Sequence, residues 1–284
     1  MKAGFIGLGH LGKAIANRLI SQGVDLIVWN RTPGKANDMG VEIAENPATL
    51  ALKVPVIILN LFDSSAVRSV LEGDNGLLES DIQGKLVIDT TTNHFDDVAY
   101  FHDLIRSHGG QYLESPVLGS VGPASQGTLS ILASGEKNAY EKALPYLQKI
   151  GKSIFYLEKP TLSTKMKLVN NLILGTFMAT LAEAVTFGEA IGLDKSKVLD
   201  ILDAGAGNSG ILHAKRDTLI REDFSPQFQS ALIYKDLHYL EELAFELKKP
   251  LFIGSVVKEL YGMTYSLDEE MLDFSALYKI FKDY

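Results

Sequence analysis

The sequence predicts an α/β domain followed by an all-α domain. From residue 1 to about 160, short apolar runs alternate with segments of helical length, which is the pattern of βαβ units around a largely parallel sheet. Every later segment has helical periodicity. The 284 residues are 46% hydrophobic and 22% charged, an ordinary composition for a globular chain long enough to hold two cores. We therefore expect domains at 1–160 and 161–284.

The strands expected in the first domain include several near-continuous apolar runs, as in a sheet that is covered on both faces. They are Ala3–Ile6, Leu26–Trp29, Val41–Ile43, Val56–Leu61, Leu86–Asp89, Tyr112–Leu113, Leu129–Ala133 and Ile154–Leu157. Helices are expected between the early strands, at Leu11–Gln22, Lys35–Met39 and Ser65–Leu71.

The second domain is expected to begin with one long interdomain helix over residues 161–191, with Thr161 or Ser163 as its N-cap. The helices expected after it are Lys195–Leu202, Leu212–Ile220, Lys235–Leu247, Gly254–Tyr265 and Phe274–Phe281.

Composition and charge narrow the class of protein. A net charge of −8 argues against nucleic acid or an anionic membrane as the main partner. No cysteine is present, so disulfides and thiolate chemistry are excluded. Polar residues interrupt every long apolar run, and the histidines lack metal-ligand spacing, so we expect neither a membrane span nor a metal site. The chain begins directly with a strand, which predicts no signal peptide and a cytoplasmic location.

A glycine motif follows the first expected strand. Gly7, Gly9 and Gly12 form a G-x-G-x-x-G frame that opens a helix. In this position the glycines allow a tight turn and a close approach of the backbone to a pyrophosphate, which the helix N-terminus attracts. The motif therefore indicates a Rossmann-type dinucleotide-binding domain. A glycine turn that only packs a strand against a helix is the alternative.

The end of the second strand indicates which dinucleotide would bind. An NAD site usually carries an acidic residue there, for the ribose 2′-hydroxyl. Here the sequence has Asn30, Arg31 and Thr32, followed by Lys35. A guanidinium pairs with a 2′-phosphate through charge-assisted hydrogen bonds, so NADP is favoured over NAD. The alternative is a solvated basic turn.

Within the long helix, Lys167 and Asn171 are four residues apart and therefore share one face. Burial among apolar neighbours can lower a lysine pKa, which suits a general acid for a carbonyl group under reduction. The alternative is a lysine that extends its ammonium group to solvent, beside an ordinary helical asparagine.

Taken together, "GFIGLGHLG", "WNRT", "DTTT" (89–92), "ESPVLGSVGPASQGTLSILASG" (114–135), "TKMKLVNN" (164–171) and "YKDL" (234–237) resemble the β-hydroxyacid dehydrogenase family. The resemblance to these 3-hydroxyisobutyrate dehydrogenase-related enzymes covers essentially the whole chain, with the motifs in order. It implies a fold like that of 6-phosphogluconate dehydrogenase. The "WNRT" segment looks most like the branch of NADPH-dependent glyoxylate and succinic semialdehyde reductases.

The resemblance implies roles for individual residues. Lys167 matches the catalytic lysine and Asn171 the asparagine one turn later. The cofactor-binding residues expected from the motifs and the resemblance together are Gly7, Leu8, Gly9, His10, Leu11, Gly12, Asn30, Arg31, Thr32, Lys35, Leu61, Thr92 and Lys235. Those expected to bind substrate are Leu118, Gly119, Ser120, Lys167, Asn171, Phe228 and Asp236.

One departure concerns the loop that holds the substrate carboxylate in this family, which commonly reads Pro-Val-Ser-Gly-Gly. Here Leu118 replaces the serine, and a hydroxyl group appears at Ser120 instead. Leucine has no donor, so backbone N–H groups near Gly119 and Ser120 would have to hold the carboxylate.

These observations predict hydride transfer between NADP(H) and a small aldehyde or 2-oxo acid or its hydroxy acid, of the glyoxylate or succinic semialdehyde type, with Lys167 as general acid or base. The alternatives are an NAD-dependent 3-hydroxyisobutyrate-type dehydrogenase, an imine reductase and a dinucleotide-binding module without catalysis. The resemblance also implies a homodimer or homotetramer that assembles through the helical domain.

Overall fold

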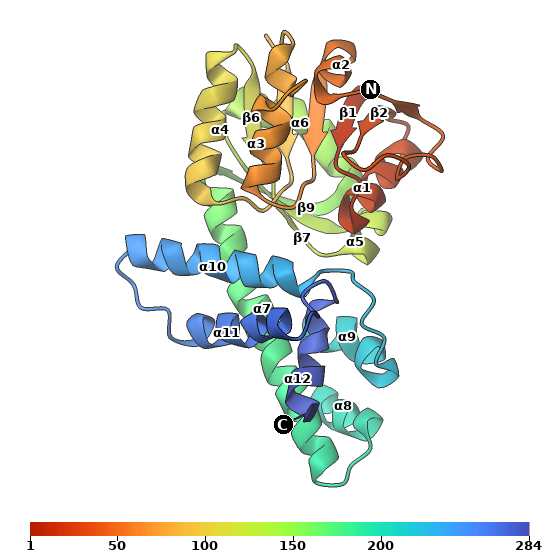
Figure 1. Cartoon of the computed structure of the whole chain (residues 1–284), viewed down its shortest axis with the longest axis vertical. Coiled ribbons are helices and arrows are strands. Elements are labelled where there is room, and N and C mark those ends of the chain that lie inside the picture. Colours follow the sequence, from red (N-terminus) through yellow and green to blue (C-terminus); the bar gives the residue numbers. More distant parts are fainter. Residues whose placement is uncertain (284) are drawn as a thin grey trace. The chain divides into compact units, whose positions relative to one another are not determined.

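The computed structural model describes residues 1–283, which fold into two compact units, Met1–Lys167 and a second unit that begins at Leu168. The division falls inside the long helix α7 (Leu162–Ala190), which passes from the first unit into the second (Figure 1). The domain boundary predicted from the sequence lies between residues 160 and 161, just before this helix begins.

The first unit is built on one sheet. Its strands are β1 (Lys2–Ile6), β2 (Asp25–Trp29), β3 (Glu42–Ile43), β4 (Val56–Leu59), β5 (Leu86–Asp89), β6 (Gln111–Glu114), β7 (Val117–Leu118), β8 (Leu129–Ser134) and β9 (Gly151–Glu158). They lie in the order β3-β2-β1-β4-β5-β6-β8-β7, with β9 also paired to β8. Pairing is parallel from β3 to β6, whereas β8 runs antiparallel to β6 and β7. The predicted α/β fold is confirmed.

Successive strand residues point to opposite faces of this sheet, and apolar residues lie on both faces, so helices cover both. Phe5 packs on one face in a core with α1 (His10–Ser21), α5 (Val121–Gln126) and α6 (Lys137–Ile150). The next residue, Ile6, joins the opposite core with α2 (Pro47–Lys53), α3 (Ser64–Glu72) and α4 (Phe95–Ser107). Figure 1 shows this unit with α3 and α4 on one side of the strands.

The helix expected at Lys35–Met39 is wrong. Residues 33–38 form consecutive turns. Gly34 at φ 90° and Gly40 at φ 63° flank the expected helix. Left-handed glycines at both ends stop a helix that is too short to be stable alone. The expected strand Val56–Leu61 ends early, at Leu59. The Asn60 side chain and the Leu61 N–H instead donate to the hydroxyl groups of Thr90 and Thr91, directly after β5.

The second unit is helical, as predicted. After α7 come α8 (Lys195–Ala204), α9 (Gly210–Arg221), α10 (Ser230–Glu246), α11 (Phe252–Ser266) and α12 (Leu277–Asp283). Short 3₁₀ turns lie at Leu77–Glu79 in the first unit and at Phe274–Ala276 in the second. The helix expected at Phe274–Phe281 therefore starts as a 3₁₀ turn. Helices α10 and α11 pack against each other.

Helix α7 satisfies the length and composition test for a membrane span, contrary to the expectation from its polar interruptions. Its most apolar window has a mean hydropathy of 1.4, and 44% of that window is buried inside the protein. Core helices of soluble proteins pass the same test. Tight packing at Gly175, where a Cβ atom would lie 3.3 Å from Ile233 of α10, marks one buried face of α7.

Candidate active site

The carboxyl ends of the strands form one continuous row across the first unit. The paired residues Trp29–Ile6, Ile6–Leu59, Leu59–Asp89, Asp89–Glu114 and Glu114–Ser134 run from β2 to β8. Ligands of open α/β sheets bind beyond such an edge. The glycine motif, the segment that begins at Asn30, and Thr92 all follow strands that end in this row.

The glycine loop fits a dinucleotide pyrophosphate. Gly7 has φ 102°, and a Cβ atom there would lie 2.2 Å from the Asn60 carbonyl oxygen. A Cβ atom on Gly12 would lie 2.1 Å from the Gly7 carbonyl oxygen. At Gly9 a Cβ atom would meet nothing within 4 Å, and no side chain caps the N-terminus of α1. The N-terminus of α1 therefore has no capping side chain and has open space beside Gly9, where an anion is favoured.

Asn60 and two threonines join the strand ends beneath this loop. The Asn60 amide nitrogen donates to Thr90 Oγ1 at 2.9 Å, and the Leu61 N–H donates to Thr91 Oγ1 at 2.9 Å. Leu61, one of the predicted cofactor residues, is half-buried. Sequence reasoning missed Asn60. Its position could have identified it, because Asn60 is a polar residue directly after a buried strand, at the edge of the sheet where ligands bind.

The segment after β2 is attached to the glycine loop through Asn30. Its Oδ1 accepts from the Leu8 N–H at 2.8 Å, and its Nδ2 donates to the Thr32 carbonyl at 2.9 Å. Arg31, Thr32 and Lys35 are exposed. Within residues 1–283, no ion pair engages Arg31 or Lys35.

A buried polar cluster lies behind Thr92, which is itself half-buried. Asp89 accepts from the Thr91 N–H at 2.9 Å, from Asn93 Nδ2 at 2.8 Å and from the Tyr112 hydroxyl at 2.7 Å. Complete burial raises the pKa of Asp89, although these donors oppose the rise. The cluster fixes the turn after β5. Of the residues in this turn, only Thr92 was predicted from the sequence as a site residue.

The predicted carboxylate loop follows β7. Leu118 is half-buried and pairs with Ser130 of β8, and Ser120 precedes the first residue of α5. Gly119 is exposed with φ 122°, and a Cβ atom there would lie 2.9 Å from Leu129. The loop conformation therefore requires glycine at this position.

Lys167 belongs to the first unit and is 7% exposed on α7. Asn171, one turn later, belongs to the second unit and is fully buried. Its Nδ2 donates to Asp236 Oδ2 at 2.6 Å, and its Oδ1 accepts from Asn170 at 3.1 Å. The other oxygen of Asp236 accepts from Lys235 Nζ at 2.7 Å. The structure thus joins three of the predicted residues, Asn171, Lys235 and Asp236, in one hydrogen-bonded network in which Asn171 and Asp236 are buried and Lys235 is half-buried.

Phe228 lies before α10 and is half-buried. Its ring contacts that of Phe274 edge to face, with centroids 5.6 Å apart. Its N–H donates to Asp273 Oδ2 at 3.2 Å, and its carbonyl accepts from the Phe274 N–H at 2.8 Å. Asp273 itself is fully buried and pairs with Lys215 at 2.8 Å.

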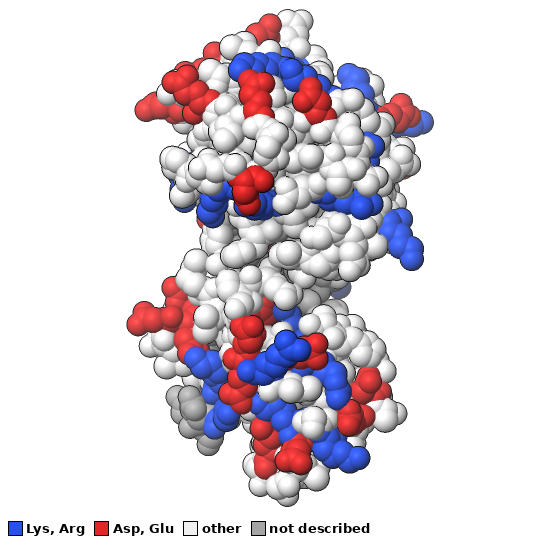
Figure 2. Space-filling model, turned by 90° about the vertical axis from the view of Figure 1, so that its right-hand side faces the viewer, with Lys and Arg blue, Asp and Glu red and all other residues white. Residues whose placement is uncertain are grey.

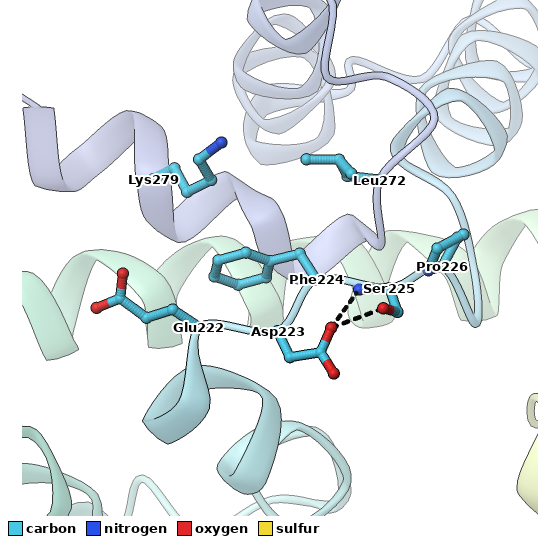
Figure 3. A pocket seen from close by; sticks show the side chains of 7 residues that line it. All are labelled: Glu222, Asp223, Phe224, Ser225, Pro226, Leu272 and Lys279. Carbon is cyan, nitrogen blue, oxygen red and sulfur yellow. Dashed lines mark hydrogen bonds between the residues drawn. The ribbon is translucent and has the colours of Figure 1, made fainter.

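A depression of about 440 Å³ in the second unit is lined by none of the predicted site residues. Figure 3 shows Lys279 and Leu272 on one side of it and the segment Glu222–Pro226 on the other, with the Asp223 carboxylate accepting from Ser225.

Among residues 1–283, no group of three or more His, Cys, Asp or Glu is arranged to hold a metal ion. On the face shown in Figure 2, basic and acidic side chains are interspersed over both units.

Comparisons with known proteins agree with this architecture. Residues 2–158 match the model of the NAD binding domain of 6-phosphogluconate dehydrogenase. Residues 163–281 match that of the NAD-binding region of NADP-dependent 3-hydroxyisobutyrate dehydrogenase. Glyoxylate/succinic semialdehyde reductase 1 of Arabidopsis thaliana is 33% identical over 99% of this chain and 99% of its own.

Two further proteins are similar over nearly the whole chain. The human cytokine-like nuclear factor N-PAC is 32% identical over 99% of this chain, which spans only 51% of that longer protein. The solved structure of Psf3 in complex with NADP+ and 2-OPP has a TM-score of 0.90 and 25% identity, and covers 98% of this chain and 99% of its own.

Proposed function

This chain belongs to the 3-hydroxyisobutyrate dehydrogenase-related family of β-hydroxyacid dehydrogenases, and from that premise we propose that it reduces a small aldehyde or 2-oxo acid with NADPH. The observation that carries the proposal is the buried lysine, Lys167, on a helix that begins in the same unit as the open glycine cradle. A substrate of the glyoxylate or succinic semialdehyde type has the support of the Arabidopsis reductase.

The chemistry divides between the cofactor and the chain. When bound, NADPH supplies the hydride. Lys167 gives its proton to the carbonyl oxygen of the substrate, so that an alcohol forms instead of an alkoxide. Backbone N–H groups at Gly119 and Ser120 hold the substrate carboxylate. Asn171 has its Oδ1 and one Nδ2 hydrogen engaged by Asn170 and Asp236, so it has one amide hydrogen left for substrate.

NADP is proposed over NAD because of the segment after β2. A 2′-phosphate there would meet the exposed Arg31 and Lys35 and the Thr32 hydroxyl, with no acidic residue between positions 30 and 37. A guanidinium group binds a phosphate in a bidentate manner, whereas a carboxylate would repel it. The NADP+ complex of the similar Psf3 structure supports the same cofactor.

The alternatives differ in what they require of Lys167. An NAD-dependent 3-hydroxyisobutyrate-type dehydrogenase would use it in the oxidative direction, and an imine reductase would act on a C=N bond. A module that binds a dinucleotide without catalysis needs no proton donor. The similarity to N-PAC, a nuclear factor by name, favours that last possibility as the second candidate.

A substrate panel tests the proposal. NADPH oxidation is measured with glyoxylate, succinic semialdehyde and methylmalonate semialdehyde, and with a cyclic imine. We expect turnover with an aldehyde or 2-oxo acid, and a loss of about 10²-fold or more in kcat for Lys167→Ala. Arg31→Asp should reduce kcat/KM for NADPH by about 10-fold or more and spare that for NADH.

The other outcomes are equally specific. Turnover of the imine alone would indicate an imine reductase. NADPH binding without turnover of any substrate would favour the non-catalytic module. Equal rates with NADH, unchanged in Arg31→Asp, would refute the cofactor assignment.

A homodimer or homotetramer is proposed as well. The second unit exposes large apolar side chains, including Phe187 (67%), Ile191 (76%), Phe245 (85%), Phe252 (79%) and Val256 (63%). Apolar area of this kind commonly becomes buried between subunits. Sedimentation velocity on the purified chain distinguishes an oligomer from a monomer.

A further inference from the structure

We propose that Glu114 is a positioning residue, which holds the N-terminal turn of α7 at the sheet edge and thereby fixes where Lys167 lies. The expected effect of Glu114 on kcat rests on the proposed function, whereas its effect on the position of α7 does not. Its structural part concerns residues of the first unit only, Met1–Lys167.

The first observation is how α7 begins. Side chains at the ends of two strands accept from two backbone N–H groups in the first turn of α7 and from the N–H group of Thr161, directly before the helix. Glu114, the last residue of β6, accepts from the Thr161 N–H and, through Oε2, from the Thr164 N–H at 2.9 Å and the Thr164 hydroxyl. Ser134, the last residue of β8, accepts from the Ser163 N–H at 3.1 Å, and the two serine hydroxyls lie 2.7 Å apart.

The two strand residues that cap α7 are neighbours in the sheet. Glu114 and Ser134 form the pair that joins β6 to β8, and Glu114 also pairs with Asp89 of β5. They therefore belong to the row of strand ends that continues to Ile6, directly before the glycine loop. That row places the start of α7 three strands from β1, about 14 Å at the usual strand spacing.

The second observation is backbone strain at the same point. Thr161 has φ 73°, a left-handed conformation that is rare for a β-branched residue. Such a conformation persists only where the surroundings determine it. Here the Glu114 carboxylate accepts from the Thr161 N–H, and the Thr161 carbonyl accepts from the Lys165 N–H at 2.9 Å.

The third observation is burial. Glu114 is 2% exposed, and Ser134, Ser163 and Thr164 are completely buried. A buried carboxylate is costly unless it is fully hydrogen-bonded, and a helix N-terminus favours its negative charge. An apolar residue would fill this position at less cost, so the carboxylate indicates a requirement for a defined helix start.

Lys167 lies one turn after Thr164, so the position of its ammonium group follows from the rotation and height of α7. A shift of the helix by one residue would turn Lys167 by about 100° and move it about 1.5 Å along the axis. A displacement of about 1 Å can reduce a rate by about 10²-fold. The caps exclude such a shift, because each N–H group has one specific acceptor.

The carboxyl group also titrates in an accessible range. Burial raises the pKa of Glu114 to about 7, although the hydrogen bonds from Thr161 and Thr164 oppose the rise. The ionisable groups that face it are Asp89 on β5, Tyr112 on β6 and His102 on α4, whose Nε2 lies 4.0 Å away. Burial lowers the pKa of His102 to about 4, so His102 stays neutral while Glu114 gains its proton.

The test compares Glu114→Gln with Val67→Ala. Val67 is completely buried on α3, in the core that Ile6 joins. It takes no part in the hydrogen bonds at the start of α7, so its truncation destabilises the same unit and leaves those bonds in place. Glutamine retains one acceptor but turns an NH₂ group toward the N–H donors. We expect kcat to fall about 10-fold or more in Glu114→Gln with less than about a 3-fold change in KM for NADPH, and to stay within about 2-fold in Val67→Ala.

Two further readouts separate positioning from a general loss of stability. By hydrogen exchange, the amides of residues 163–168 should exchange about 10-fold faster in Glu114→Gln and be unchanged in Val67→Ala. As the pH falls from 8 to 6, kcat of the wild type should approach the pH-independent level of Glu114→Gln. Glu114→Asp keeps the charge and should therefore retain more of the wild-type kcat than Glu114→Gln does. If Glu114→Gln does not fold, Thr164→Val is compared with Val67→Ala in its place.

Each outcome has one meaning. If Lys167→Ala retains activity, the proposed function is wrong, and the hydrogen-exchange comparison alone decides whether Glu114 anchors α7. If Lys167→Ala is inactive while Glu114→Gln matches Val67→Ala in kcat and pH profile, Glu114 is not a positioning residue. Rapid exchange of the amides of residues 163–168 in Glu114→Gln with an unchanged kcat would also overturn the positioning role of Glu114.

Discussion

Gly9 and Gly12 lie three residues apart, yet a methyl group would meet different surroundings at the two positions. At Gly9 it would enter open space, with a backbone at φ −68° and ψ −176° that alanine adopts without strain. At Gly12 it would lie 2.1 Å from the Gly7 carbonyl oxygen. One glycine therefore leaves room for a ligand, and the other leaves room for the protein itself.

This difference predicts distinct effects of alanine. Gly9→Ala should raise the Kd for NADPH about 10-fold or more and leave Tm unchanged, because the methyl group would occupy only the ligand's space. Gly12→Ala should lower Tm as well, since the loop must move. Fluorescence titration with NADPH and thermal unfolding measure the two effects.

Gly210→Ala is the matched control. It adds a methyl group in open space at the start of α9, and both Kd and Tm should stay close to those of the wild type. Equal losses of affinity and stability at Gly9 and Gly12 would contradict the assignment of the loop as a cradle.

At the scale of elements, the buried pair of Lys215 and Asp273 ties α9 to the segment that carries Phe228. Lys215 and Asp273 have side chains 6% and 1% exposed. The same carboxylate accepts from the backbone N–H groups of Gln227, Phe228 and Ser275. The ammonium group of Lys215 also lies 5.1 Å from the Phe274 ring centroid.

Removal of the lysine should therefore be costly. Lys215→Met should destabilise the protein by about 3 kcal/mol, because it leaves Asp273 buried with only neutral donors. Urea unfolding measures the change. Lys197→Met on α8 removes an exposed lysine and should change the free energy of unfolding by less than about 0.5 kcal/mol. If Lys215→Met loses no more free energy of unfolding than this control does, the pair of Lys215 and Asp273 does not stabilise the fold.

The elements also show what the sequence can predict. Long periodic segments such as α7 and the buried runs such as β5 were predicted within a residue or two, because their patterns are local. The two-residue strand β7 has no period of its own and forms only against β8. Of the two predicted caps of α7, Thr161 does stand directly before the helix, and its carbonyl accepts from the Lys165 N–H at 2.9 Å. The side-chain acceptors, however, are Glu114 and Ser134, which lie 29 to 50 residues away in the chain.

In the candidate site too, local patterns were predicted and contacts between distant parts of the chain were not. Residues of the glycine loop and of the β2 end were identified because a local motif names them. Asn60 and Asp89 were missed, because their contacts join strands that are neighbours only in the sheet. The side-chain roles expected of Lys167, Phe228 and Thr92 stay predictions until substrate is present.

At the scale of the whole molecule, two buried groups give opposite contributions to the pH dependence of stability. Glu114, with its pKa raised to about 7, binds a proton more tightly in the folded state, so its contribution to stability falls as pH rises from about 4.5 to 7. His102, with its pKa lowered to about 4, binds a proton less tightly in the folded state, so its contribution grows as pH rises from about 4 to 6.5. Between pH 4.5 and 6.5 the two nearly cancel.

Removal of the histidine should expose the slope due to Glu114. In His102→Gln the free energy of unfolding should fall by roughly 1 kcal/mol per pH unit between pH 5 and 6.5, relative to the wild type. Urea titrations at several pH values measure it. His108→Gln, at the exposed end of the same helix, should keep the wild-type profile. A wild-type profile in His102→Gln as well would mean that His102 gains its proton at the same pH in the folded protein as in the unfolded chain.

The Asn30 side chain has a consequence for anyone who would engineer the cofactor preference. Its amide accepts from Leu8 in the glycine loop and donates to the Thr32 carbonyl. The acidic residue that NAD recognition usually requires at this point, introduced as Asn30→Asp, would keep the bond to Leu8 but lose the donor to Thr32. A redesign toward NAD must therefore supply a new donor for that carbonyl, or the turn that holds Arg31 loosens along with the change in charge.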